Sequence, residues 1–382
     1  MKLRLAPLAA TVLLATACSG SPDGTASEAG TAPATSTPAT STPATSAPAT
    51  SAPASSVPSS TTTATTTTTE APAARAVDVV PRPEASTVAD LLTLARPLVI
   101  AHAGGDFEAP HSTMYAFTLA ALAGTDVLEM DVMTTADDVL VVHHDDTVDR
   151  TTETTGAVRD LTYDELVELD NAHWFVEGTW SDQSRPDDEY LLRGVRTGAR
   201  PAPEGFGPDD FRIETFRSVA ESFPNHVLDV EIKVQSTPEG EPDLERAVRT
   251  AQLLADEIAD LGRGESVIVV SFDVDVIAAF RDAAPGVATS PALDTLVGWY
   301  VGEPVEFATS DVVFQVPPVF GGIEVLTPDV VARAQADGFE VWAWMDDTST
   351  QENADFYADL IGRGIDGLLV SRPVVALDVV AG

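Results

Sequence analysis

A small set of histidines, acids and one lysine stands within or directly after short apolar runs of the sequence. These residues are His102, Glu129, Asp131, His144, Glu231 and Lys233. Because residues two apart on a strand point to the same face, Glu129 and Asp131 share a face. Neighbouring carboxylates repel unless a cation lies between them, and all-oxygen ligands suit Ca²⁺ or Mg²⁺ better than zinc. We therefore expect Glu129, Asp131 and Glu231 to bind one of these divalent metals.

Two histidines beside such a metal indicate paired acid–base chemistry. Of His102 and His144, one would take the proton of the nucleophile and the other would protonate the leaving oxygen. Lys233 shares a face with Glu231 and would place a positive charge beside an anionic group such as phosphate. An ion-pairing role is the alternative, although Lys233 is the only lysine after Lys2 in a chain that otherwise uses arginine. The set predicts metal-assisted phosphodiester cleavage.

Strand-like apolar runs alternate with helix-period segments through residues 77–382, which indicates a parallel sheet with crossover helices. Eight parallel candidates begin near residues 98, 127, 226, 267, 287, 311, 339 and 365. Eight such units predict a (β/α)₈ TIM barrel, an α/β fold whose active sites lie at the C-terminal ends of the strands. An open doubly wound sheet is the alternative, but no glycine-rich dinucleotide fingerprint follows the first run.

One further strand, residues 139–144, follows the run 127–133 after only a short polar turn. A connection this short cannot make a parallel crossover, so we expect an antiparallel hairpin. The hairpin would return His144 to the neighbourhood of Asp131. An irregular insertion at about 171–211 comes after this hairpin, and its length and its aromatic residues indicate a lid or a substrate-contacting segment.

The start of the chain has the pattern of an exported lipoprotein. Residues 1–18 have a basic start, an apolar run and small residues before Cys18, the chain's only cysteine. An ordinary cleaved signal is the alternative. Residues 19–76 are mostly Ser, Thr, Pro and Ala, which predicts a disordered stalk before the domain at 77–382. We expect a cell-surface protein anchored to the bacterial membrane at Cys18, or a secreted one.

The formal net charge of −39 argues against nucleic acid as a partner. The predicted partner is instead a small-molecule phosphodiester substrate, and the sequence implies no protein partner.

The order of the motifs resembles that of the glycerophosphodiester phosphodiesterase family. The family pattern is His-Arg-Gly, Pro-Glu-Asn-Thr, Glu-x-Asp, His-Asp, Arg-Thr-Thr and Glu-x-Lys. The matching segments are His102-Ala103-Gly104, Pro110-His111-Ser112-Thr113, Glu129-Met130-Asp131, His144-Asp145, Arg150-Thr151-Thr152 and Glu231-Ile232-Lys233. Residues 341–344 resemble the family's tryptophan strand, and residues 364–367 its Gly-Val-Asp-Gly ending.

The resemblance implies metal-dependent hydrolysis of glycerophosphodiesters to an alcohol and glycerol 3-phosphate. It implies His102 and His144 as acid and base, Glu129, Asp131 and Glu231 as metal ligands, and Lys233 and Trp344 as substrate contacts. Two alternatives stay open. One is a phospholipase D-like or phosphatidylinositol-cleaving enzyme on the same barrel, and the other is a non-catalytic surface binding module.

Two departures from the family pattern bear on the substrate. Ala103 replaces the family's arginine, which removes a phosphate contact, and His111-Ser112 replaces Glu-Asn. His111 is either a loop residue or a substitute proton donor or anion contact. The histidines His143, His173 and His226 belong to no motif and are expected to serve packing.

Overall fold

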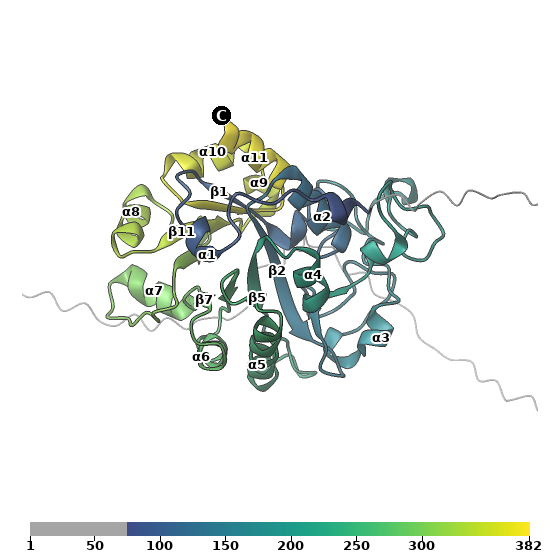
Figure 1. The fold of residues 1–382 in the computed structure, drawn as a ribbon, viewed down its shortest axis with the longest axis horizontal. Coiled ribbons are helices and arrows are strands. Elements are labelled where there is room, and N and C mark those ends of the chain that lie inside the picture. The colour runs from purple at the N-terminus through teal and green to yellow at the C-terminus, as the bar shows by residue number, and fades with distance from the viewer. Residues whose placement is uncertain (1–74) are drawn as a thin grey trace, which may run out of the picture. The chain divides into compact units, whose positions relative to one another are not determined.

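The computed structural model describes residues 75–382, so the predicted signal, Cys18 and the stalk up to residue 74 lie outside the described residues. Eight parallel strands form a barrel within that range (Figure 1). They are β1 (Leu98–Ala101), β2 (Val127–Thr134), β5 (Val227–Ile232), β6 (Val267–Val270), β7 (Ala288–Thr289), β8 (Val313–Val316), β11 (Glu340–Trp344) and β12 (Gly367–Val370).

The strands lie side by side in the order β7-β6-β5-β2-β1-β12-β11-β8. A parallel bridge joins Thr289 of β7 to Asp311, which lies just before β8, so the barrel is nearly closed. The predicted (β/α)₈ barrel is confirmed, and each of its eight strands falls within or next to the run that predicted it.

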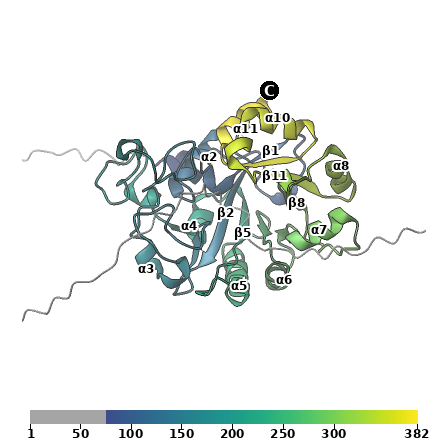
Figure 2. The same ribbon diagram turned by 180° about the vertical axis from the view of Figure 1, so that it is seen from behind.

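Helices lie around the strands in views from opposite sides of the molecule (Figures 1 and 2). They are α2 (Met114–Ala123), α4 (Phe216–Ser222), α5 (Leu244–Asp260), α6 (Val274–Ala283), α7 (Leu293–Val301), α8 (Pro328–Ala336), α10 (Ala354–Gly362) and α11 (Pro373–Ala381). The sequence did not predict α7 and α11. Both helices are apolar over most of their length and α11 is rich in valine, so neither shows a clear helical period or propensity.

One predicted helix is divided in the structure. The helix expected at 213–222 is a short strand, β4 (Glu214–Thr215), followed by α4, and Thr215 caps that helix. The helix expected at 352–362 is present as α10, with Asn353 as its N-cap, and the separate short helix α9 (Thr348–Gln351) precedes it. A small hairpin of β9 (Val319–Phe320) and β10 (Ile323–Glu324) follows β8.

The expected antiparallel hairpin is present. It is formed by β2 and β3 (Leu140–Val142), with Val132 opposite Val142. The His143 amide extends the ladder by donating to the Asp131 carbonyl at 3.0 Å. His144 therefore follows directly after a strand that is fixed against β2.

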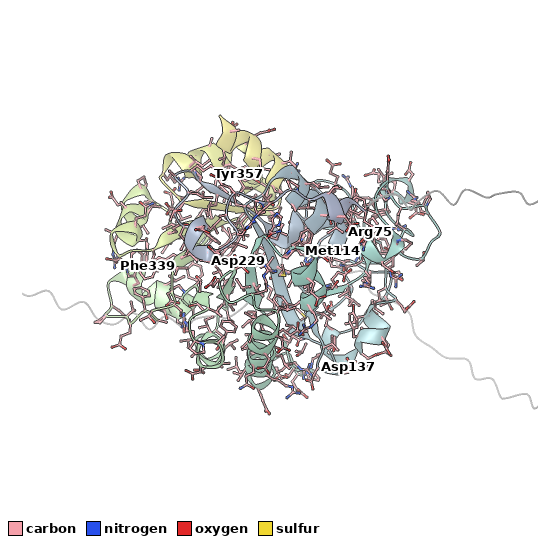
Figure 3. All side chains as sticks on the ribbon, viewed as in Figure 1. Arg75, Met114, Asp137, Asp229, Phe339 and Tyr357 are labelled. Atoms are coloured by element: carbon pink, nitrogen blue, oxygen red, sulfur yellow. The ribbon has the colours of Figure 1, made fainter. Side chains whose placement is uncertain are left out.

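Apolar side chains fill the N-terminal half of the barrel. Leu98, Ile100 and Val127 are buried there with Trp342, and the short helix α1 (Val88–Leu91) closes this end through Val88 and Leu91. Further along the interior, Asp229 lies among the central strands (Figure 3). Burial of each large apolar side chain contributes about 1.5–3 kcal/mol to the free energy of folding. The apolar N-terminal half of the barrel therefore gives stable support to the polar residues at the C-terminal ends of the strands.

The insertion at 171–211 has little regular structure beyond the 3₁₀ helices η4 (Asp187–Glu189) and η5 (Pro208–Phe211). It packs against the barrel through its own small core, and Phe211 stacks on Tyr115 of α2 with ring centroids 4.8 Å apart. The Ala76 amide, at the end of the predicted stalk, donates to the Gly205 carbonyl at 2.9 Å.

Another short helix, α3 (Tyr163–Leu166), precedes the insertion. None of the helices in residues 75–382 has both the length and the apolar character needed to cross a bilayer.

Candidate active site

The pairing register of β2 and β5 brings the predicted acids together. Asp131 lies beside Glu231. Glu129 lies beside Asp229, two residues closer to the N-terminal end of the strands. The Lys233 Nζ atom is 2.9 Å from Asp131 Oδ1 and 3.1 Å from Glu231 Oε2. Lys233 therefore lies between two of the acids on the face that the sequence predicted.

Glu129 is held by the turn that follows β1. The Ala103 amide donates to Glu129 Oε2 at 2.7 Å, and Ala103 adopts a left-handed backbone with φ of 46°. A left-handed non-glycine residue costs about 1–2 kcal/mol, so the surrounding structure must enforce this turn. Gly104 follows at φ of 83°, where a Cβ atom would lie 2.9 Å from Ala116 of α2. Only glycine allows this close approach.

The charges of the acids depend on their surroundings. Burial raises the pKa of Glu129 well above its usual value, and the neighbouring charge of Asp131 raises it further. Burial also opposes ionisation of Asp131, but Lys233 outweighs it and lowers the Asp131 pKa. Among the described residues, Asp131 Oδ2 is buried without a hydrogen-bond partner. This arrangement favours a bound cation.

The hairpin and the turn after β1 bring the two predicted histidines to the same acids. The ring centroids of His102 and His144 are 5.9 Å apart. One donor atom from each of His102, Asp131 and His144 lies within 4.8 Å of the others, so these three could also hold a metal ion. Of the predicted carboxylate ligands, this group contains only Asp131.

A carboxylate lies against the Nδ1 atom of each histidine. His102 Nδ1 is 3.3 Å from Asp106 Oδ1, and His144 Nδ1 is 2.7 Å from Asp145 Oδ1. Arg150 in turn donates to Asp145 from Nε at 2.6 Å and from Nη2 at 2.9 Å. Because Nδ1 is engaged in this way, proton transfer by either histidine would involve its Nε2 atom.

The pKa directions agree with this pairing. Burial raises the pKa of Asp145, but Arg150 and His144 outweigh it and hold that pKa well below its usual range. Burial also raises the pKa of Asp106, but His102 brings it to about 2. For His102, burial lowers the pKa, whereas the charges of Asp106 and Glu129 raise it well above its usual value.

Asp106 was not among the predicted site residues. Its contact with His102 depends on a turn in which Ala103, Gly104 and Gly105 all have positive φ, and no sequence spacing reveals that shape. Asp145 could be found more easily, because it stands next to His144 in the His-Asp motif.

The structure places His111 inside the site and not on an exposed loop. Its ring lies 5.7 Å from His143 and 5.8 Å from His144, and the residue is buried. Neither ring nitrogen has a hydrogen-bond partner in residues 75–382. Burial and the nearby charge of Arg150 hold the His111 pKa well below its usual value.

The other histidines pack as expected. His143 is buried, and its Nε2 atom is 3.1 Å from the Thr147 carbonyl. The His173 ring lies 4.7 Å from that of Trp174. His226 is buried at the start of β5, far along the strand from the acids.

Aromatic residues border the site. Trp180 of the insertion lies with its ring 5.4 Å from that of His144 and 4.4 Å from Arg150 Cζ. The insertion therefore contributes to the site, although Trp180 was not a predicted site residue. The predicted substrate contact Trp344, at the end of β11, stacks on Phe272 with centroids 6.0 Å apart.

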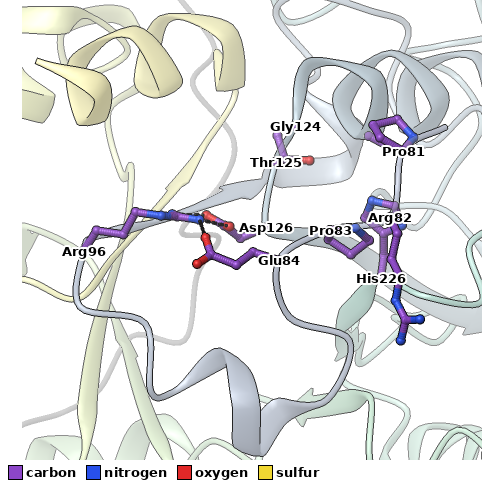
Figure 4. Close-up of a pocket in the computed structure, with 10 residues that line it drawn as sticks. Pro81, Arg82, Pro83, Glu84, Arg96, Gly124, Thr125, Asp126 and His226 are labelled. Atoms are coloured by element: carbon purple, nitrogen blue, oxygen red, sulfur yellow. Dashed lines mark hydrogen bonds and ion pairs between the residues drawn. The ribbon is translucent and has the colours of Figure 1, made fainter.

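A separate hollow of about 250 Å³ lies at the N-terminal end of the strands (Figure 4). Arg82, Glu84, Arg96, Asp126 and His226 contribute to its lining. Arg96 is already paired there with Asp126 and Glu84. No predicted site residue lines this hollow, so it is distinct from the candidate active site.

Comparison with known proteins agrees with this geometry. Residues 102–375 match the model of the Glycerophosphoryl diester phosphodiesterase family. A glycerophosphodiester phosphodiesterase of Caldanaerobacter subterraneus subsp. tengcongensis is 27% identical over 285 residues, which are 75% of this chain and 98% of that protein.

Solved structures show the same fold. One is a putative glycerophosphoryl diester phosphodiesterase from Silicibacter pomeroyi, with a TM-score of 0.55 and 19% identity over 80% of this chain and 97% of that one. Another is an Oleispira antarctica phosphodiesterase in complex with the product sn-glycerol-3-phosphate, with a TM-score of 0.53 and 20% identity over 75% and 98% of the two chains.

The fold, the site and these similarities define the class of the protein, which is a phosphoric diester hydrolase built on a TIM barrel. More specifically, the chain belongs to the Glycerophosphoryl diester phosphodiesterase family.

Proposed function

We propose that this protein hydrolyses glycerophosphodiesters to an alcohol and glycerol 3-phosphate with a divalent metal and two histidines. The observation that carries the proposal is the position of Asp131. It lies beside Glu231 and Lys233, and a donor atom of each of His102 and His144 is within reach of it. Carboxylates that could hold a cation, two histidines that could transfer protons and an ammonium group therefore lie close together, which supports the proposal.

The donor set fits a divalent cation. Glu129, Asp131 and Glu231 would hold the metal through oxygen atoms, the ligands that Ca²⁺ and Mg²⁺ prefer. The buried, unpartnered Asp131 Oδ2 and the raised pKa of Glu129, caused by burial and by the charge of Asp131, both favour a cation at this position. When bound, the metal would polarise a phosphoryl oxygen of the substrate.

The two histidines would move the protons. Water attacks phosphorus, and the bond from phosphorus to the alcohol oxygen breaks. One histidine takes a proton from the water and the other gives a proton to the departing oxygen. Asp106 and Asp145, at the Nδ1 atoms of His102 and His144, orient both rings for this transfer.

Lys233 and Trp344 would contact the substrate. Lys233 already balances the charge of Asp131 and Glu231, and its ammonium group would also attract a phosphate oxygen. Trp344 offers an aromatic face and an Nε1 atom that is buried without a partner among the described residues.

The position of the enzyme in the cell is part of the proposal. Residues 1–18 would direct export, Cys18 would carry a lipid anchor, and residues 19–76 would hold the barrel, residues 77–382, away from the membrane. Labelling of cells with a radioactive fatty acid tests this. Incorporation into the wild-type protein and not into Cys18→Ala supports the anchor, and equal labelling of both contradicts it.

The activity is tested with a panel of phosphodiesters, with and without a chelator. Glycerophosphodiester hydrolysis that stops on chelation and returns with Ca²⁺ or Mg²⁺ is the expected result. Cleavage confined to choline-containing lipids or to phosphatidylinositol would favour the alternative enzymes. Binding of phosphodiesters without turnover would favour the surface binding module.

A further inference from the structure

Two hydrogen-bond donors beside His144 have no partner among the residues that the structure describes. Arg150 Nη1 and Trp180 Nε1 are both buried, and neither meets an acceptor within residues 75–382. The guanidinium carbon lies 4.4 Å from the centre of the Trp180 ring, so the two groups are stacked neighbours. Buried donors without acceptors are rare in folded proteins and unfavourable, and their occurrence as a pair indicates a ligand that accepts hydrogen bonds.

The other two nitrogen atoms of the Arg150 guanidinium group are held by hydrogen bonds. Its Nε and Nη2 atoms both donate to Asp145, which also accepts from His144 Nδ1 at 2.7 Å. The Trp180 ring reaches His144 from the insertion, at 5.4 Å between ring centroids. Both unpaired donors are therefore held at one of the two proposed catalytic histidines.

Arg150 carries a positive charge, so an anionic acceptor suits the Nη1 donor that has no partner in the described residues. Ala103 stands where the family pattern has arginine, and Lys233 is paired with Asp131 and Glu231. His111 stands where the pattern has glutamate, and its ring centroid lies 5.8 Å from that of His144. After burial, the charge of Arg150 is the next cause that lowers the pKa of His111, so the two side chains are near one another. No carboxylate at position 111 competes for Arg150, and in the described part of the chain only Asp145 accepts hydrogen bonds from its guanidinium group.

We propose that Arg150 Nη1 and Trp180 Nε1 bind the phosphate group of the substrate, and so replace the arginine that is absent at position 103. This inference rests on the proposed function. A phosphate oxygen would accept from both donors, and a guanidinium group suits such recognition better than a lysine. Because both donor atoms are covered by protein, Trp180 has to shift when the anion enters, which makes its fluorescence a direct reporter.

The test compares Trp180→Phe with Trp299→Phe. Trp299 offers a matched control, because Arg333 stacks on it at 3.9 Å while its Nε1 donates to Asp337, away from the site. Inorganic phosphate is the probe, with calorimetry, tryptophan fluorescence and inhibition of hydrolysis as readouts. We expect Trp180→Phe to weaken phosphate binding and to raise KM about tenfold, the effect of one hydrogen bond to a charged group. Trp299→Phe should change neither.

A second variant tests the charge. His111→Glu places a carboxylate near Arg150 and should weaken phosphate binding by about tenfold or more, whereas His111→Gln should weaken it less because it adds no charge. Unchanged phosphate binding in folded Trp180→Phe and in folded His111→Glu would overturn the proposal. If the wild-type protein binds phosphate in this way but hydrolyses no phosphodiester, the proposed function fails and the anion site stands.

Discussion

Asp145→Asn is expected to slow catalysis strongly without unfolding the protein. In the wild-type structure, the Asp145 carboxylate accepts from three donors, namely His144 Nδ1 and the Nε and Nη2 atoms of Arg150. An asparagine side chain has nearly the same shape but offers only one acceptor oxygen and a donating amide group.

Either orientation of that asparagine creates a conflict. If its oxygen faces His144, its amide group points its hydrogens at the Arg150 donors. If its oxygen faces Arg150, the amide donates to His144 Nδ1 and places the ring proton on Nε2, which is the wrong tautomer for a base. A hydrogen bond to a charged group contributes about 1.5–3 kcal/mol, so kcat should fall about 10- to 150-fold.

The assay is steady-state hydrolysis of a glycerophosphodiester, with the folded fraction of each variant checked by circular dichroism. Asp311→Asn is the matched control. Asp311 is a carboxylate that pairs with Arg281 and accepts from Thr289 at 2.7 Å, and it precedes β8 at the other end of the barrel. That variant should be less stable and keep its kcat.

A folded Asp145→Asn enzyme with wild-type kcat would refute this reasoning. It would mean that the chain from Arg150 through Asp145 does not set the tautomer of His144. A rise in KM alone would refute it as well, because orientation of a proton-transfer group acts on the chemical step.

Three further outcomes are expected. Asp106→Asn should lower kcat about tenfold, as the 3.3 Å contact to His102 is the longer of the two, and a change confined to thermal stability would contradict this. Glu231→Gln should raise the Ca²⁺ or Mg²⁺ concentration for half-maximal activity at least about tenfold, and unchanged activation would remove Glu231 from the metal site. Burial lowers the pKa of His226 from 6.5 to about 4. As the pH falls from 6.5 to about 4, His226 is therefore protonated in the unfolded chain before it is protonated in the folded one, and up to about 3 kcal/mol of stability is lost. His226→Gln should flatten that loss in denaturant titrations at several pH values, and an identical pH dependence in both proteins would contradict it.

The barrel could be predicted because its strands carry their signal locally. Runs such as 98–101 and 267–270 are apolar and rich in β-branched residues, and both faces of each strand are buried. The proximity of Asp131 and His144 also followed from the sequence, since the polar turn between β2 and β3 is too short for anything but a hairpin. These features depend on few residues at short separation.

The missed features depend on contacts between distant segments. Trp180 reaches His144 only through the path of an irregular insertion, which has no period to follow. The burial of His111 depends on how the loop before α2 packs against His143 and His144. The roles of α7 and α11 were hidden for a different reason, because helices that are apolar on most sides lack the amphipathic pattern.

The most direct measurement of the central claim is phosphorus NMR of glycerophosphocholine hydrolysis in water enriched in ¹⁸O, with Ca²⁺ or Mg²⁺ present. Attack of water at phosphorus with loss of choline predicts glycerol 3-phosphate that carries one ¹⁸O atom on phosphorus, and no product in the chelated sample or with His102→Ala or His144→Ala. Formation of choline phosphate or of a cyclic phosphate without ¹⁸O, or undiminished turnover after chelation, would contradict metal-dependent hydrolysis by these two histidines.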